Sequence, residues 1–204
     1  MRRRGRAAAA VVLGVTALAD VAAAQRPHRS GLWFELGSGP AAVRVACAGC
    51  ADVSFEAGSG GYLRLGGVLS DRVLLGVEAF GFDDEAFGFT AGDTTFVAET
   101  GAVGAVVLWF PWRSGAFLKG GVGIAEGTFT TMPTTGSPVI AEGVGVGLTF
   151  GLGWDVAISR KFAITAQGAV HISGIGDIVA PGIGVRVEDV IATMYHVSIG
   201  LTIR

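Results

Sequence analysis

The sequence predicts an all-β chain, an eight-stranded antiparallel transmembrane up-and-down β-barrel. Half of the 204 residues are hydrophobic and only 16% are charged, yet no segment after residue 24 is an unbroken apolar run long enough for a membrane helix. From Gly31 onward the apolar residues recur with a period of two, in segments about as long as a tilted membrane strand. The chain also contains 34 glycines, many of them inside these segments, where they would destabilise helices.

Residues 1–24 have the layout of a secretory signal peptide. Four arginines precede an apolar run of Ala, Val and Leu, and three alanines end the segment before Gln25. The run is shorter than the roughly 20 residues that span a bilayer, which favours cleavage after Ala24 over a membrane anchor. We therefore expect one barrel domain over residues 25–204. Four of the 15 basic and one of the 17 acidic residues would leave with the signal peptide. The resulting net charge of about −5 argues against nucleic acid as a partner.

Eight strands follow from the periodicity, and the connections between them alternate in length. The predicted strands are Leu32 to Ala41, Gly60 to Leu69, Val73 to Phe82, Phe96 to Phe110, Ala116 to Thr128, Gly143 to Ile158, Phe162 to Ser173 and Asp189 to Ile203. The short connections are 70–72, 111–115 and 159–161, and the long ones are 42–59, 83–95, 129–142 and 174–188. Outer-membrane barrels have short periplasmic turns and long outer loops, so this alternation predicts that both ends of the barrel domain are periplasmic.

Each predicted strand has one apolar face and one face of small or polar residues that carries isolated charges. A membrane barrel turns its apolar face to lipid, so the charges are expected in the lumen. An unpaired charge in a narrow lumen is costly, and we therefore expect a buried network of ion pairs. Its residues are Glu35 and Glu78 with Arg64 and Lys119, and Gln167 and His196 lie nearby. Such a network is either a structural plug or a gate across a small pore, and the narrow interior of eight strands favours the plug.

Aromatic residues gather near the predicted periplasmic ends of the strands. Aromatic side chains at this level of a membrane barrel typically form an interfacial girdle. The residues expected in this girdle are Trp33, Phe34, Trp109, Phe110, Trp112 and Trp154.

Three segments resemble the OmpA/OmpW-like superfamily of small outer-membrane β-barrel proteins. They are "GGYLRLGGVLSDRVLLGVEAFGF", "AFLKGGVGIAEGTF" and the closing "YHVSIGLTIR". In the last of these, Ser198, Gly200 and the alternating apolar residues are similar to the signal read by the barrel-assembly machinery, although Arg204 stands where an aromatic residue is usual. The resemblance implies a barrel in the outer membrane of a Gram-negative-type bacterium, with that machinery as a partner. It implies architecture more than activity.

The two cysteines, Cys47 and Cys50, lie three positions apart in "VACAGCAD", within the first predicted long loop. Outside the cell a disulfide persists, which makes a Cys47–Cys50 bond the expected state. A redox site is a weaker alternative because the loop has no helical pattern to lower the pKa of a thiol. A zinc site is also weaker because no further pair of ligands has the required spacing.

The enzymatic alternative is a lipid A deacylase. That family is also a small barrel and uses a His-x-Ser pair near the outer end of a late strand. Here His171 and Ser173 share the inward face, and the acids that might orient the histidine are Glu142, Asp177 and Glu188. In the deacylases the pair faces lipid and is followed by Asn and Ala, which "HISGIGD" lacks. We therefore expect no enzyme and no catalytic residues.

The expected function is a structural or surface-interaction role, with long extracellular loops and a polar, plugged lumen. A narrow pore or conduit for small apolar molecules, as in OmpW-like barrels, is the alternative, and a lateral or lumenal pocket large enough for a ligand would favour it. We expect a monomer surrounded by outer-membrane lipid and lipopolysaccharide, with no cofactor. Acidic loop residues such as Asp83, Asp84, Glu85 and Asp93 are more typical of a solvated loop than of a cation site.

Overall fold

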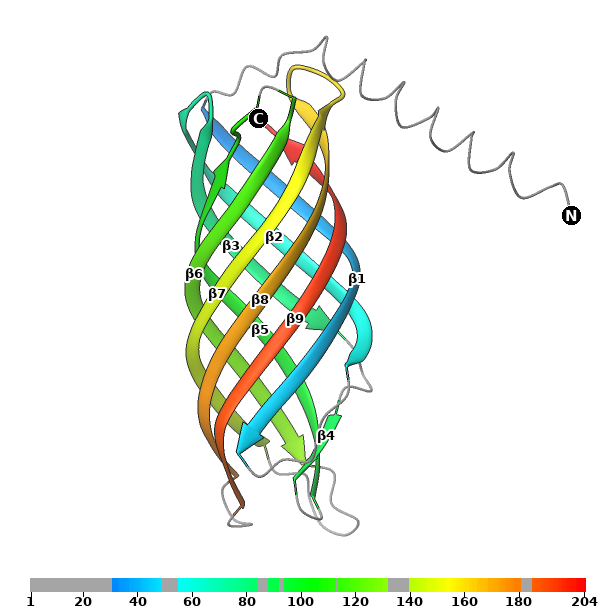
Figure 1. The fold of residues 1–204 in the computed structure, drawn as a ribbon, viewed down its shortest axis with the longest axis vertical. Helices are drawn as coiled ribbons and strands as arrows, with labels where there is room; N and C mark the ends of the chain where they lie inside the picture. Colours follow the sequence, from blue (N-terminus) through cyan, green and yellow to red (C-terminus); the bar gives the residue numbers. More distant parts are fainter. Residues whose placement is uncertain are drawn as a thin grey trace, which may run out of the picture.

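The structure is a computed structural model, and it describes residues 31–48, 55–83, 88–91, 94–112, 114–131, 140–180 and 185–204. The predicted signal peptide therefore lies outside the described residues. The strands, in chain order, are β1 (Leu32–Ala48), β2 (Glu56–Ser70), β3 (Val73–Asp83), β4 (Gly88–Ala91), β5 (Thr94–Trp109), β6 (Ala116–Thr131), β7 (Ile140–Ala157), β8 (Phe162–Ala180) and β9 (Val185–Ile203) (Figure 1). No helix among the described residues is long and apolar enough to cross a membrane.

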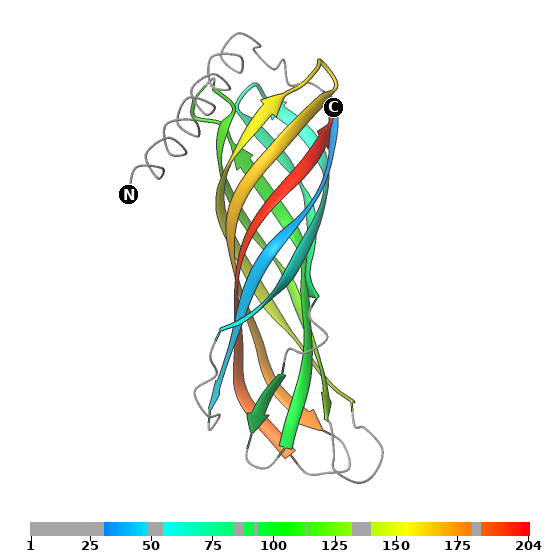
Figure 2. The ribbon, with the colours of Figure 1, turned by 90° about the vertical axis from the view of Figure 1, so that its right-hand side faces the viewer.

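Eight of these strands close into one antiparallel barrel. In the ring, β1 pairs with β2 and β9, β2 with β3, and β3 directly with β5, and from β5 to β9 each strand pairs with the next. β4 pairs with the start of β5 and lies outside the closed ring of eight. The two views show strands tilted around a long barrel, with the start of β1 and the end of β9 at the same end (Figures 1 and 2). The predicted eight-stranded up-and-down barrel is confirmed.

The barrel wall is apolar outside and mixed inside, the reverse of a soluble barrel. Outward side chains such as Leu152 and Ile199 are 66% and 69% exposed, whereas the inward Arg64 is fully buried. Exposed apolar side chains on every barrel strand are stable only where lipid covers them. The period-two pattern therefore encodes a lipid-facing surface, because neighbouring residues of a strand point to opposite sides of the sheet.

The strands extend further from the periplasmic end than the sequence predicted. β1 continues to Ala48 instead of ending at Ala41, and β2 begins at Glu56 instead of Gly60. β8 and β9 each have 19 residues and remain paired as far as Ala180 and Val185. In these extensions the apolar side chains turn inward, as Val43 and Val45 do, so the outward apolar pattern marks the lipid-facing part of a strand and not its end.

The interior has three layers along the barrel axis. On β1, Trp33 comes before Glu35 and Val43 follows it, and on β3 the order is Leu74, Glu78 and Phe82. The periplasmic apolar layer contains Trp33, Leu74, Val106, Leu108, Phe110 and Phe117. The central polar layer contains Glu35, Tyr62, Arg64, Glu78, Lys119, Thr149, Gln167, His171, His196 and Ser198. The outer apolar layer contains Ala41, Val43, Val45, Phe82, Ile175, Ile178, Val187, Val190, Ala192 and Met194.

Two of the predicted girdle residues are in the lumen instead. Trp33 and Phe110 are each 1% exposed and belong to the periplasmic apolar layer. Trp33 shares the inward face with Glu35, so the alternation of β1 overrides the preference of tryptophan for the membrane interface. Trp109 and Trp154 are exposed on the outer wall, and Trp112 is exposed in the turn after β5. These three positions agree with a girdle.

Candidate functional site

The central polar layer is built around the guanidinium of Arg64. It donates hydrogen bonds to the carboxylates of Glu35 (Nη1 to Oε1, 3.1 Å) and Glu78, and to the amide oxygen of Gln167. The Lys119 ammonium donates to both carboxylate oxygens of Glu78, at 3.0 and 3.1 Å. The structure thus brings together the four charged residues that the sequence placed in one network. Gln167 on β8 accepts a further hydrogen bond from Arg64.

Sheet register explains why these side chains meet. Glu35 on β1, Arg64 on β2 and Glu78 on β3 are direct cross-strand partners on the inward face. Opposite charges at paired positions stabilise a sheet, and this row alternates acid, base and acid. Tyr62 lies on the same inward face, two residues from Arg64, but the charge network predicted from the sequence did not include it. Its hydroxyl donates to Glu35 at 2.6 Å, and its ring lies 4.2 Å from the Arg64 guanidinium carbon.

A second polar cluster lies nearer the periplasmic end and was not predicted. Asp155 pairs with Arg204 and accepts a hydrogen bond of 2.9 Å from Thr165, whose hydroxyl is 2.8 Å from that of Thr202. The alternation of β7 had placed Asp155 on the inward face, which was the one available signal. Arg204 thus acts as a buried counter-ion for a lumen carboxylate in this barrel.

The histidine and serine of the deacylase alternative are buried in the lumen. His171 Nδ1 is 2.9 Å from the hydroxyl of Thr149, and the histidine ring stacks on Phe80 with 3.6 Å between ring centroids. Its Nε2 has no hydrogen-bond partner among the described residues. The candidate orienting acids Glu142, Asp177 and Glu188 are all exposed, and none of them forms a hydrogen bond with the buried His171. Among the described residues, His171 therefore has no hydrogen-bonded acid to orient it as a catalytic base.

The cysteine motif lies at the outer end of β1. Cys47 belongs to the strand, not to the loop where the sequence placed it, and it packs against the outer apolar layer. Cys50 lies outside the described residues, so the disulfide stays a prediction. Asp84, Glu85 and Asp93 also lie outside them. Within the described ranges, no three His, Cys, Asp or Glu side chains are grouped so as to hold a metal ion.

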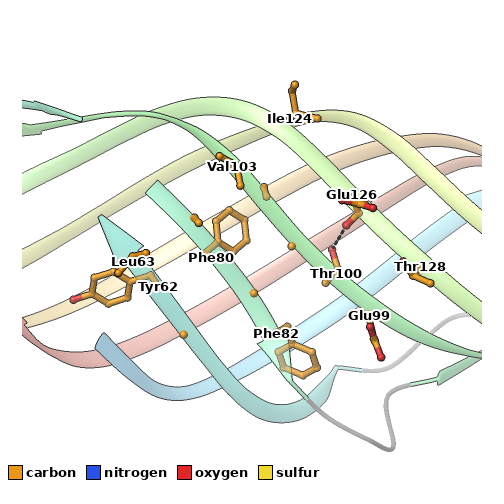
Figure 3. A pocket seen from close by; sticks show the side chains of 15 residues that line it. Tyr62, Leu63, Phe80, Phe82, Glu99, Thr100, Val103, Ile124, Glu126 and Thr128 are labelled. Atoms are coloured by element: carbon orange, nitrogen blue, oxygen red, sulfur yellow. Dashed lines mark hydrogen bonds between the residues drawn. The ribbon is translucent and has the colours of Figure 1, made fainter. Parts of the chain in front are cut away.

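A groove of about 1210 Å³ crosses the outer wall over β2, β3, β5 and β6 (Figure 3). Gly61, Gly81 and Gly101 are cross-strand partners on the outward face, and together they leave a strip of wall without side chains. Beside this strip stand the exposed apolar residues Leu63, Val103 and Ile124. By contrast, a lumen cavity beside Glu78 and Thr149 has a volume of about 10 Å³, which is room for about one water molecule.

The groove has different chemistry at its two ends. Glu99, Glu126 and Thr128 lie at one end, and Leu63 lies at the other (Figure 3). On β6, Ile124 precedes Glu126 in the direction that leads away from the periplasmic turn, so the acidic end is the outer end. Glu126 is exposed on the same face as the lipid-facing Ile124 and therefore marks the upper border of the apolar band.

No family model matches the chain, and no curated protein matches it. Solved structures do. Neisserial surface protein A (NspA) is 15% identical with a TM-score of 0.55, and the match covers 85% of this chain and 97% of that one. Ail, the attachment invasion locus protein of Yersinia pestis, in complex with the heparin analogue sucrose octasulfate, is 15% identical with a TM-score of 0.58, covering 84% of this chain and 99% of that one.

The outer membrane protein OprG from Pseudomonas aeruginosa is a third structure of this kind. It is 15% identical with a TM-score of 0.53, and the match covers 88% of this chain and 99% of that one. At this identity the likeness concerns the fold, which spans nearly the whole of each matched chain. Together with the lipid-facing wall, it identifies the chain as a small eight-stranded β-barrel of the outer membrane of a Gram-negative-type bacterium.

Proposed function

We propose that this barrel is not an enzyme, that its lumen is closed, and that it acts through the parts that project outside the membrane, in a structural or surface-interaction role. The filled lumen carries the proposal. Apolar layers occupy both ends, and the layer between them holds paired charges that are at most 4% exposed. An ion or solute would have to displace packed aromatic side chains at the periplasmic end before it reached the central charge network, and eight strands leave little space to do so.

The length of the strands also supports a surface role. β8 and β9 have 19 residues each, which correspond to about 44 Å along the barrel axis at a rise of about 3.3 Å per residue and a tilt of about 45°. The hydrocarbon core is only about 30 Å thick. The wall therefore continues beyond the lipid at the outer end and presents polar residues such as Glu142, Asp177 and Glu188.

The charge of this outer region limits the class of partner. Ail was crystallised with a sulfated heparin analogue, so a barrel of this fold is able to carry a site for a polyanion. The described outer region here includes exposed carboxylates of Glu126, Glu142 and Glu188. Like charges across an interface oppose association, and we therefore expect a neutral or basic partner for this barrel.

A second candidate function, binding of a small apolar molecule, is favoured by the groove. The groove lies on the lipid side of the wall, so it supports binding at the wall more than passage through the lumen. The deacylase alternative has less support, because His171 is buried and faces a filled lumen. We also propose a monomer that contacts lipopolysaccharide in the outer leaflet and is inserted by the barrel-assembly machinery.

Conductance in planar bilayers tests the closed lumen. The refolded chain, its folding verified by a heat-dependent shift in gel mobility, should show no steady channel openings. Arg64→Ala removes the centre of the polar layer but neither apolar layer, so it should also remain closed. Discrete openings in the parent would overturn the proposal, and openings in the variant alone would make the network a gate. Incubation with lipopolysaccharide and mass spectrometry of lipid A should show no loss of an acyl chain.

A further inference from the structure

We propose that the groove in the outer wall binds an amphiphile that has an aliphatic chain and a cationic, ammonium-bearing head group. This inference deepens the second candidate function and rests on it, but it does not depend on whether the lumen conducts. It combines three observations: the glycine strip, the apolar residues beside it, and the two carboxylates at its outer end.

The glycine strip provides the space. A Cβ atom placed on Gly81 would meet its nearest neighbour, the Thr100 carbonyl oxygen, only at 4.0 Å, and one on Gly61 would meet the Gly37 carbonyl oxygen at 3.8 Å. Gly61 and Gly81 are therefore not imposed by close contacts within the wall, whereas a Cβ on Gly101 would lie 3.0 Å from the Phe80 carbonyl oxygen. Larger residues would fit at positions 61 and 81 and would fill the groove. A volume of about 1210 Å³ is above the usual range of about 300 to 1,000 Å³ for ligand pockets, so a long alkyl chain has room.

The apolar part fits a chain that lies parallel to the lipids. Leu63, Val103 and Ile124 are 47%, 56% and 66% exposed and stand beside the strip. Val103 and Ile124 lie on the periplasmic side of Glu99 and Glu126 along β5 and β6, and Leu63 on β2 lies at the end of the groove opposite the two acids (Figure 3). A chain bound here would point toward the centre of the bilayer with its head group at the outer surface. Each methylene buried contributes about 0.8 kcal/mol relative to water, but lipid tails compete for the same surface, so the head group must supply the selectivity.

The head group is selected by charge. Glu99 pairs in register with Thr128, and Glu126 pairs with Gly101, which lies two residues from Glu99 on the same face of β5. Both carboxylates are exposed at the end of the groove. No described basic residue lines the groove. An ammonium group placed there would be attracted by both carboxylates, whereas a phosphate or sulfate would be repelled.

Photo-crosslinking of the refolded full chain in phosphatidylcholine nanodiscs tests the inference. Three probes with the same twelve-carbon, diazirine-bearing chain are compared, ending in an ammonium, a sulfate or a hydroxyl group. The ammonium probe should label the segments 61–63, 79–81, 99–103 and 124–128 in a saturable manner, about five- to tenfold more strongly than the other two. Labelling spread evenly around the barrel would overturn both the groove as a site and the second candidate function.

Equal labelling of the groove by the ammonium and hydroxyl probes would overturn the head-group assignment and leave the apolar site in place. Labelling by the sulfate probe that appears only with millimolar Mg²⁺ would also overturn it, because the carboxylates would then hold a bridging cation. The conductance experiment is a separate measurement, so its failure and the failure of this inference are distinguishable.

Two pairs of variants distinguish the contribution of the open glycine strip from that of the two carboxylates. Gly81→Leu should reduce labelling by every probe, because it fills the strip. Gly168→Leu, its control on β8, has nothing within 4 Å of the added Cβ and should not change labelling. Glu99→Gln with Glu126→Gln should reduce labelling by the ammonium probe to the level of the hydroxyl probe. Glu142→Gln removes a nearby exposed acid that does not line the groove and should leave the preference intact. The opposite result in either pair would refute the inference, with folding of each variant checked by gel mobility.

Discussion

Replacement of Arg64 by methionine removes a side chain that forms hydrogen bonds with residues of three other strands, β1, β3 and β8. Arg64 is fully buried and donates to Glu35, Glu78 and Gln167. Methionine has a similar length and leaves the space filled, so the loss is electrostatic. Glu78 would keep the ammonium of Lys119, but Glu35 would keep only the hydroxyl of Tyr62.

The expected loss of stability follows from the fact that Glu35, unlike Glu78, is left without a basic partner. Removing one partner of a buried ion pair costs about 3 to 5 kcal/mol, because the remaining charge is uncompensated. The carboxylate left uncompensated here is that of Glu35, so neutralising it should restore much of the stability. In the double variant Glu35→Gln, Arg64→Met, the ion pair of Glu78 and Lys119 remains balanced. We expect this double variant to be about 2 kcal/mol more stable than Arg64→Met alone, within the usual range of coupling energies.

Equilibrium unfolding in urea, in lipid vesicles and followed by tryptophan fluorescence, measures these values. Arg72→Met in the exposed turn between β2 and β3 is the control, and its free energy of unfolding should equal that of the parent. A loss below about 1 kcal/mol for Arg64→Met would refute the reasoning. So would a double variant as unstable as the sum of the two single variants, because Glu35 would then not depend on Arg64.

Three further predictions concern packing, orientation and the cysteines. Gly104→Ala should destabilise the barrel by about 1 to 3 kcal/mol, because its Cβ would overlap the backbone of the facing glycine on β6, whereas Gly168→Ala should be neutral; urea unfolding compares them. Brominated lipids should quench the fluorescence of a variant that retains only Trp109 and should barely quench one that retains only Trp33, and equal quenching would contradict the inward placement. Thiol titration of the unfolded, unreduced chain should find no free thiol, and two free thiols would rule out the disulfide.

The fold was predictable because, in a membrane barrel, alternate residues of each strand face lipid and lumen and therefore differ in polarity. In β2 the sequence alternates Leu63 and Leu65 with Tyr62 and Arg64, and the structure places the leucines toward lipid and the other two in the lumen. Short periplasmic turns fix which strands are neighbours, and neighbouring strands in an up-and-down barrel pair directly. The charged network was predictable from the alternation and the strand order together. They place the charged residues on the inward face at similar depths, where buried charges pair with one another.

The remaining features depend on information that alternation does not carry. Trp33 and Trp109 are both tryptophans near the periplasmic end, where a girdle is expected. Only their positions in the two-residue alternation determine that Trp33 faces the lumen and Trp109 faces lipid. Tyr62 was placed on the correct face, but its hydroxyl bond to Glu35 depends on side-chain reach across the register. At the outer ends of β1, β8 and β9 the apolar side chains lie inside the barrel, so the outward apolar pattern used to delimit the strands does not reach these ends. The groove depends on Gly61, Gly81 and Gly101, which lie on three different strands. Their positions along the sequence do not indicate that they are neighbours in the wall.

The partners of Arg64 also bear on how the barrel folds. Glu35 precedes Arg64 by 29 residues, Glu78 follows it by 14, and Gln167 follows it by 103. The hairpin of β2 and β3 can satisfy only one of these bonds, and the three strands β1 to β3 can satisfy two. The bond to Gln167 requires that β8 has curled round to face β2, which happens when the sheet closes. In an open or mispaired sheet, the Arg64 guanidinium would therefore lack at least one of its hydrogen bonds. Only a barrel closed in the correct register gives Arg64 its complete set of hydrogen bonds, which distinguishes it from partly assembled states.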